Sequence, residues 1–179
     1  MSELRLPPSV KRVVEICRSM GFKVFLIGAR ALEFYGVVRH TADWDLAIDQ
    51  PFTVEVRDRL TEALRGAGYA VQWRKWGLYV DAAGVHIYHA PLMLDSDFIS
   101  RCREAGGVFI PSPEDLVILK LASGERKDID DLKRLLRLPL DLSYLKKRAL
   151  QAGLDKELWK IWRSPPLRRP ASPGGLGHA

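Results

Sequence analysis

The sequence of 179 residues contains no asparagine and only three glutamines. Depletion of these thermolabile amides is typical of thermophilic proteins, and a biased base composition is the alternative explanation. Cysteine is also rare, and Cys17 and Cys102 lack the spacing of a metal site or a redox motif. Both lie in amphipathic stretches, so we expect small core residues and a reducing compartment.

Long hydrophobic runs are missing as well. The longest are far too short to cross a bilayer, and the first residues lack the pattern of a secretory signal peptide. We therefore expect a cytoplasmic protein without a membrane partner. Hydrophobic residues still make up 47% of the chain, which is enough for a core and too many for a disordered protein.

The net charge is +6, from 28 basic and 22 acidic residues. A polyanionic partner such as a nucleotide or RNA fits this charge. Ordinary surface solubility explains it equally well.

Hydrophobic periodicity predicts alternating helices and strands, followed by helices alone. We expect helices at 9–20, 30–35 and 53–65, and strands at 23–27, 43–48, 69–73, 78–81, 85–89 and 108–110. The turn at Ala83-Gly84 predicts a hairpin between the strands around it. Ser112 and Pro113 have the features of a helix N-terminus, opening the first of four further helices, and Asp141 caps the third of these.

The fold class that follows is α/β (α+β), with a small mixed sheet flanked by helices and then a C-terminal helical bundle. We expect an α/β core at 1–110 and a helical subdomain at 111–163. Residues 164–179 are rich in Pro, Gly and Arg, a composition that predicts a flexible basic arm.

Two carboxylates carry the first chemical signal. Side chains two residues apart on a strand share a face, so Asp43 and Asp45 project together while Trp44 faces the core. Carboxylates roughly 7 Å apart would repel each other, and a hard divalent cation removes that penalty. Mg²⁺ prefers such oxygen ligands and would also hold the phosphates of a nucleotide.

The junction between a strand and a helix at Gly28 carries the second signal. A glycine lets the backbone approach a phosphate closely, and the free amides that follow face such an anion. Arg30, Arg39 and Thr41 supply further donors nearby. The Asp-x-Asp pair or the glycine junction alone is weak evidence for a nucleotide site, whereas the two together, in this order and at this spacing, are much more specific.

This segment resembles the signature of the DNA-polymerase-β-like nucleotidyltransferase superfamily, in which a Gly-Gly or Gly-Ser pair after the first strand precedes an Asp-x-Asp pair on the next. It is most similar to the small prokaryotic branch of minimal nucleotidyltransferases and abortive-infection toxins. The matching residues are Gly28, Tyr35, Gly36, Arg39, Thr41, Asp43 and Asp45, and later Pro113–Leu116, Lys120-Leu121 and Arg126–Leu132. The resemblance covers residues 24–136.

The chain departs from the family pattern at two positions. Ala29 stands where the family has Gly or Ser, and Arg30 offers a compensating donor. The family often adds a third carboxylate on a later strand, and His86 stands at the position expected for it; Asp81 is the nearest acid. The substitution indicates either that His86 acts as general base or that activity is weakened or lost.

Other residues have competing interpretations. Trp73 and Trp76 flank Arg74 and Lys75 at an expected turn. They form either a platform on which a nucleotide base stacks or a partly exposed hairpin tip. Trp159 and Trp162 are predicted to pack the C-terminal helices. Lys120 faces either the cleft, as a nucleotide ligand, or the solvent.

Remaining polar residues carry weaker predictions. His40 and His89 lack partners at ligand spacing and are interpreted as structural. A basic group forms either a solvated surface or a site for RNA phosphates: Lys146, Lys147, Arg148, Arg163, Arg168 and Arg169.

The resemblance implies a reaction that moves a nucleoside monophosphate (NMP) from a nucleoside triphosphate (NTP) to an acceptor hydroxyl. It also implies that Asp43 and Asp45 bind one or two Mg²⁺ ions. The residues that it implies at the nucleotide are Gly28, Ala29, Arg39, Thr41 and Lys120. The acceptor it allows is a tRNA end, a hydroxyl of a partner protein or a small molecule. The alternatives are a non-catalytic nucleotide- or RNA-binding relative, and the toxin of a pair with an antitoxin-like partner.

Overall fold

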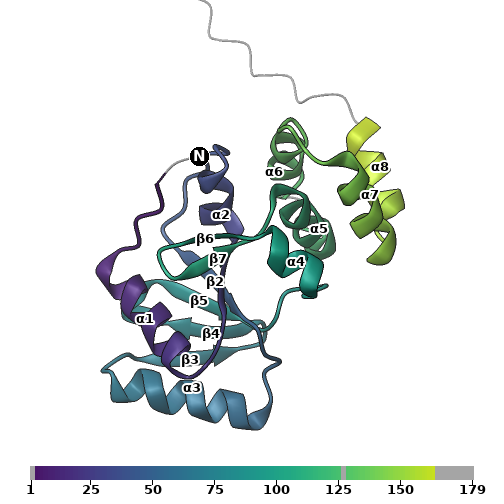
Figure 1. Cartoon of the computed structure of the whole chain (residues 1–179). Coiled ribbons are helices and arrows are strands. Elements are labelled where there is room, and N and C mark those ends of the chain that lie inside the picture. The colour runs from purple at the N-terminus through teal and green to yellow at the C-terminus, as the bar shows by residue number, and fades with distance from the viewer. Residues whose placement is uncertain (1–2, 126–127, 164–179) are drawn as a thin grey trace, which may run out of the picture.

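The computed structural model describes residues 3–125 and 128–163, which build one mixed sheet and the helices around it (Figure 1). The sheet has seven strands in the order β3-β4-β5-β2-β1-β7-β6. The strands are β1 (Val24–Ile27), β2 (Trp44–Ile48), β3 (Val71–Arg74), β4 (Gly77–Val80), β5 (Val85–Tyr88), β6 (Arg103–Ala105) and β7 (Val108–Ile110). The α/β class predicted from the sequence is confirmed.

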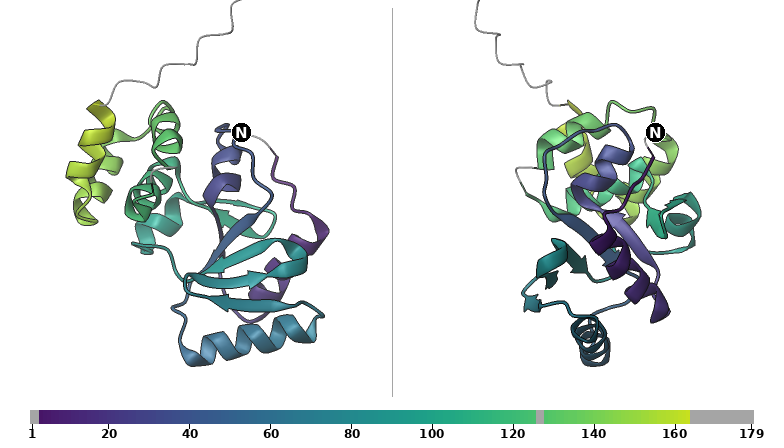
Figure 2. Two further views of the ribbon diagram at one scale, coloured as in Figure 1. Left: turned by 180° about the vertical axis from the view of Figure 1, so that it is seen from behind. Right: turned by 90° about the vertical axis from the view of Figure 1, so that its left-hand side faces the viewer.

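Helices lie on both sides of the sheet and form the C-terminal part of the described chain. They are α1 (Pro8–Ser19), α2 (Gly28–Phe34), α3 (Val54–Gly66), α4 (Ser96–Arg101), α5 (Pro113–Ser123), α6 (Asp128–Leu135), α7 (Leu142–Gln151) and α8 (Asp155–Arg163). Figures 1 and 2 show α3 along the end of the sheet that holds β3, and α5 to α8 gathered on the side away from α3. None of the helices in the described ranges is long and apolar enough to cross a membrane.

Strand pairing sets which side chains meet. β2 runs antiparallel to β1 and parallel to β5, which places Asp45 opposite His86. β4 and β5 form the expected antiparallel hairpin, joined by a short 3-10 turn (η1, Asp81–Ala83) and by Gly84 in the left-handed region at φ 59°. Tyr79 on β4 therefore lies opposite His86 as well.

The main core lies between the sheet and the helices α1 and α3 and continues through α2 into the C-terminal helices α5 to α8. The apolar faces of both helices bury against alternate residues of the strands, including Leu46, Leu78 and Ile87. A second, smaller cluster of Phe25, Ala47 and Phe98 fills the opposite face of the sheet beneath α4. The prediction that Trp44 belongs to the core is confirmed, because only 7% of it is exposed.

Buried charges hold α4, α5 and α7 together. The Arg148 side chain is fully buried and donates to Asp95 (2.7 Å), to Asp115 (3.2 Å) and to the Met93 carbonyl (2.8 Å). The predicted caps are present, since the side chain of Ser112 accepts from the Asp115 amide at the start of α5 and Asp141 caps α7. The Arg148 contacts correct its assignment to a solvated or RNA-binding group.

The prediction for the last two tryptophans is wrong. Trp159 and Trp162 are 43% and 39% exposed, and their rings contact each other at 6.3 Å between centroids. α8 buries only Leu158, so the tryptophans fall on its outer surface, where Lys146 and Arg163 flank the Trp159 ring. Arg168, Arg169 and the rest of the predicted tail lie outside the described residues.

Candidate active site

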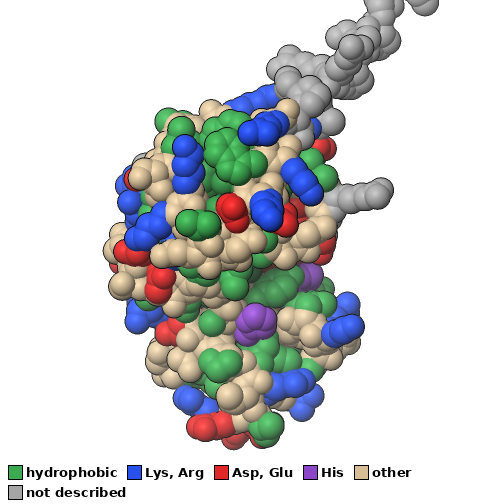
Figure 3. Space-filling model, turned by 90° about the vertical axis from the view of Figure 1, so that its right-hand side faces the viewer, with side chains coloured by type: hydrophobic (Ala, Val, Ile, Leu, Met, Phe, Trp, Pro, Cys, Tyr) green, Lys and Arg blue, Asp and Glu red, His purple; other side chains and the backbone are tan. Residues whose placement is uncertain are grey.

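A cleft of about 630 Å³ opens between the sheet and α5. Its lining includes Gly28 at the start of α2, Asp43 and Asp45 at β2, His86 and Tyr88 on β5, and Lys120 on α5. Figure 3 shows histidine side chains and hydrophobic surface within the hollow between the upper and lower parts of the molecule. Segments that are distant in sequence thus converge on one cavity of the size that holds small ligands.

The two carboxylates converge on one imidazole ring. His86 Nδ1 lies 3.3 Å from Asp45 Oδ1, and His86 Nε2 lies 3.8 Å from Asp43 Oδ2. Asp43 precedes the first residue of β2 rather than lying within the strand, and its side chain is 49% exposed, against 28% for Asp45 and 24% for His86. The site is therefore accessible to a ligand from the cleft.

Gly28 and Asp45 are in close contact. Gly28 has φ +67°, and a Cβ at this position would overlap Asp45 Oδ2 and lie 3.0 Å from Asp45 Cβ. A side chain at position 28 would therefore displace the carboxylate. The glycine that sequence reasoning assigned to phosphate approach also makes room for a site carboxylate.

Arg30 is the one predicted nucleotide ligand that the structure places away from the cleft. Its guanidinium donates to the Thr41 carbonyl at 2.9 Å and to Glu33 at 3.2 Å, and it lies over the Trp44 ring at 4.7 Å. Arg30 therefore supports the loop before β2 instead of compensating for Ala29. Thr41 and Ala29 both line the cleft.

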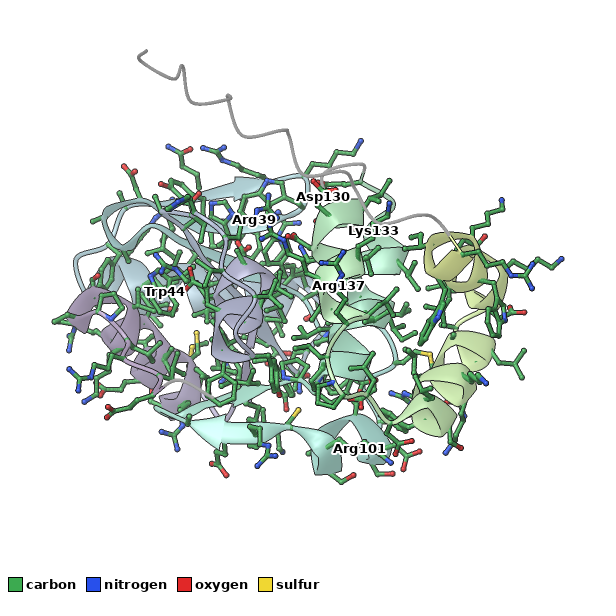
Figure 4. The ribbon with its side chains drawn as sticks, turned by 90° about the horizontal axis from the view of Figure 1, so that it is seen from above. Arg39, Trp44, Arg101, Asp130, Lys133 and Arg137 are labelled. Atoms are coloured by element: carbon green, nitrogen blue, oxygen red, sulfur yellow. The ribbon has the colours of Figure 1, made fainter. Side chains whose placement is uncertain are left out.

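Arg39 and Lys120 line the cleft and share two carboxylates of α6. Lys120 Nζ lies 2.8 Å from Asp128 and 3.0 Å from Asp131, and Arg39 lies 2.6 Å from Asp131. Figure 4 shows Arg39 beside α6, the helix that carries Asp130. Lys120 thus faces the cleft and not the solvent. Asp128 lines the cleft, and Asp131 pairs with the same two cations. The sequence places both in the matched segment Arg126–Leu132 but does not predict these ion pairs, because the partners lie on other elements.

Tyr88 is a further cleft residue that the sequence did not single out. It follows His86 by two positions on β5, so it shares the cleft face. Burial, together with repulsion of the phenolate by Asp45, Glu125 and Asp43, raises its pKa to about 12. The spacing from His86 was the available signal in the sequence.

The remaining candidates lie at the margin. Asp81 is exposed in η1 and does not line the cleft. His89 lines its far end, with a ring nitrogen 2.9 Å from the Ala90 carbonyl and the ring edge-on to Phe52. His40 is exposed.

The glycine junction, the Asp-x-Asp pair at the start of the neighbouring strand and the helices across the cleft match the nucleotidyltransferase pattern expected from the sequence. The chain belongs to the family described as "Nucleotidyltransferase of unknown function (DUF6036)", whose model matches residues 16–158. The protein is therefore a nucleotidyltransferase, an enzyme that transfers a nucleoside monophosphate to an acceptor.

Among solved structures, the solution structure of the antibiotic-resistance factor ANT(2'')-Ia is similar at a TM-score of 0.53 and 16% identity, over 85% of this chain and 96% of that one. A crystal structure of ANT(2'')-Ia in complex with adenylyl-2''-tobramycin gives a TM-score of 0.44 and 14% identity, over 83% of this chain and 90% of that one. The likeness to the solution structure shows a common fold. No curated protein matches the chain.

Proposed function

We propose that this enzyme moves the NMP of a Mg²⁺-bound NTP, such as ATP, to an acceptor hydroxyl at the Asp43–Asp45–His86 site. One observation carries the proposal: both carboxylates and the imidazole converge at one point of the cleft, with the Gly28 backbone against Asp45. In this arrangement the phosphates of the NTP and the acceptor hydroxyl would bind side by side on the sheet side of the cleft.

The donor set fits Mg²⁺ in its usual nucleotide-bound form. Asp43 and Asp45 offer carboxylate oxygens at the start of β2. Residues 3–125 and 128–163 contain no group of three or more Asp, Glu, His or Cys side chains arranged to hold a metal without help from a ligand. Mg²⁺ typically takes one or two carboxylates and completes its shell with phosphate oxygens and water. When bound, it would neutralise charge on the α-phosphoryl group and the leaving pyrophosphate.

The chain's own residues supply binding and proton transfer. We assign the outer phosphates to the backbone of Gly28 and Ala29 and to the side chains of Thr41, Arg39 and Lys120, all of which line the cleft. Lys120 and Arg39 have N–H donors besides those that pair with the buried α6 carboxylates, so in this proposal both bind phosphate oxygens while they keep Asp128 and Asp131 paired.

We assign to His86 the role of accepting the proton of the attacking hydroxyl; the support for this is that its ring nitrogens lie 3.3 Å from Asp45 and 3.8 Å from Asp43. Its replacement by alanine should reduce turnover without weakening NTP binding. An unchanged turnover would remove His86 from the reaction.

The acceptor and any regulator belong to the same proposal. The resemblance leaves a tRNA end, a protein hydroxyl and a small molecule as acceptors, and a likeness at 16% identity does not choose among them. An antitoxin-like partner is a hypothesis that a neighbouring gene for a small antitoxin would support.

Calorimetric titration of NTP with and without Mg²⁺ tests the binding half. Asp43→Asn and Asp45→Asn should each weaken Mg²⁺-dependent binding by about tenfold or more and reduce turnover by at least ~100-fold. Asp81→Asn is the matched control, because it makes the same change at an exposed carboxylate outside the cleft. Unchanged NTP and metal affinity in both site variants would show that the site is misassigned.

A further inference from the structure

The cleft continues onto an open sheet face beyond His86. On β3, β4 and β5 alternate side chains such as Val71, Leu78 and Ile87 are buried in the main core against α1 and α3. The intervening side chains on the opposite face stay accessible to solvent. This face consists of Gln72, Arg74, Tyr79, His86 and Tyr88, together with Trp76 from the turn between β3 and β4. We call it the aromatic face.

The aromatic face begins at the catalytic carboxylates. Strand register places Asp45, His86, Tyr79 and Gln72 in one row across four neighbouring strands. With neighbouring strands about 4.8 Å apart, the row extends roughly 14 Å from Asp45 to the edge of the sheet. A ligand on this face therefore reaches the acid pair without leaving the sheet surface.

Rings and a guanidinium form the surface of this row. Trp76 lies over His86 at 4.7 Å between centroids and 31° between planes, and over Tyr88 at 5.1 Å and 35°. The Arg74 guanidinium lies 5.0 Å from the centre of the Tyr79 ring. Trp76 is half-buried, so part of its ring stays accessible to solvent.

The outer part of the aromatic face, on β3 and β4, is positively charged, whereas its inner end lies at the carboxylates of Asp43 and Asp45. Residues 71–80 contain Arg74 and Lys75, both exposed, and no acidic residue. Flat rings interleaved with cations on an open sheet face match the chemistry of unpaired bases and phosphates.

We propose that the aromatic face binds a single-stranded polynucleotide and presents its terminal hydroxyl to Asp43 and Asp45, which makes this strand the acceptor. The inference rests on the proposed function. The hydroxyl oxygen forms a bond to the α-phosphorus of the NTP, and the bond from that phosphorus to the bridging oxygen breaks. Pyrophosphate leaves with the electron pair, the hydroxyl proton passes to His86, and the strand gains one nucleotide.

Fluorescence anisotropy of labelled single-stranded RNA and DNA oligonucleotides, measured with the full chain and without NTP, tests the binding surface. Trp76→Ala and Tyr79→Ala should each weaken binding roughly 5- to 150-fold, the usual loss of a stacking partner. Trp76→Phe should keep affinity near wild type. Arg74→Gln should weaken binding and flatten its salt dependence.

Trp159→Ala is the matched control, because it removes an exposed tryptophan beside Lys146 and Arg163 on α8. Equal weakening by this variant, equal affinity for duplexes, or no effect of the Trp76 and Tyr79 substitutions would overturn the assignment. Loss of turnover in Trp76→Ala with unchanged oligonucleotide affinity would also overturn it, because Trp76 would then merely position His86.

Extension of the oligonucleotide tests its role as acceptor. Strands with a free terminal hydroxyl should grow by one nucleotide, and strands with a blocked end should not; RNA and DNA arms identify the sugar that is used. Transfer of NMP to a protein or small molecule, with no oligonucleotide extended, would contradict the inference. Tight, Trp76-dependent binding without any turnover of NTP would instead count against the proposed function and support the surface.

Discussion

Replacing Gly28 by alanine separates the two roles of this residue, one in the backbone and one at the site. Its φ of +67° lies in the left-handed region, where a side chain costs about 1–2 kcal/mol. The new Cβ would also overlap Asp45 Oδ2. Rotation of the carboxylate relieves that overlap but not the 3.0 Å approach to Asp45 Cβ, so the acid or the start of α2 must shift.

Gly153→Ala is the matched control. Gly153 has φ +69° and no atom within 4 Å of an added Cβ, and it follows α7, far along the chain from the cleft residues. Both variants should lose about 1–2 kcal/mol of folding free energy, which lowers the melting temperature by roughly 2–8 °C. The contact with Asp45 makes the loss in Gly28→Ala the larger of the two.

Activity distinguishes the two variants. A misplacement of a catalytic group by about 1 Å costs on the order of 100-fold in rate, so kcat of folded Gly28→Ala should fall by about that factor while Gly153→Ala keeps wild-type kcat. Steady-state turnover well below both melting temperatures measures this. If Gly28→Ala retains wild-type kcat, or if both variants lose activity equally, the close packing of Gly28 on Asp45 has no catalytic meaning.

Three further predictions concern the framework. Arg148→Met should destabilise the fold by about 3–5 kcal/mol in denaturant unfolding, because it leaves the buried Asp115 carboxylate without its cationic partner. Lys147→Met, at an exposed pair, should cost under about 1 kcal/mol, and equal losses would contradict the buried network. Burial raises the pKa of both Cys17 and Cys102 to about 12, so a thiol reagent at neutral pH should label them only after unfolding, and rapid native labelling would disprove this. The hydrogen bond from Arg148 lowers the pKa of Asp95 below its ordinary 3.8, so the ionised carboxylate stabilises the fold above pH 3.8, and this stabilisation is lost as the pH falls through the lowered pKa. The difference in melting temperature between wild type and Asp95→Asn should therefore narrow from about pH 5 to about pH 3. A difference that stays constant with pH would refute this prediction.

Local pattern was sufficient to predict most elements of the fold. The helix expected at 9–20 is found at Pro8–Ser19, and the strand expected at 23–27 at Val24–Ile27. Period-2 alternation also placed Trp44 in the core correctly. In contrast, α4 has only six residues, and β6 consists of Arg-Glu-Ala with no buried side chain, so neither element shows a hydrophobic period in the sequence.

The sequence was sufficient to predict which residues form the site, but not which side chains contact one another within it. Nothing local to Arg30 indicates that its guanidinium lies over Trp44, and the pairing of Lys120 with Asp128 arises only when α5 packs on α6. The contact between His86 and Asp45 needs the parallel register of β2 and β5, which hydrophobic pattern does not encode.

Transfer of label from NTP tests the central claim most directly. With NTP radiolabelled at the α-phosphate, wild-type enzyme and Mg²⁺ in a cell extract should label an acceptor, and NTP labelled at the γ-phosphate should not. Asp45→Asn should abolish the labelling, and Asp81→Asn should preserve it. Labelling by the γ-phosphate alone, or undiminished labelling by Asp45→Asn, would contradict nucleotidyl transfer at this site.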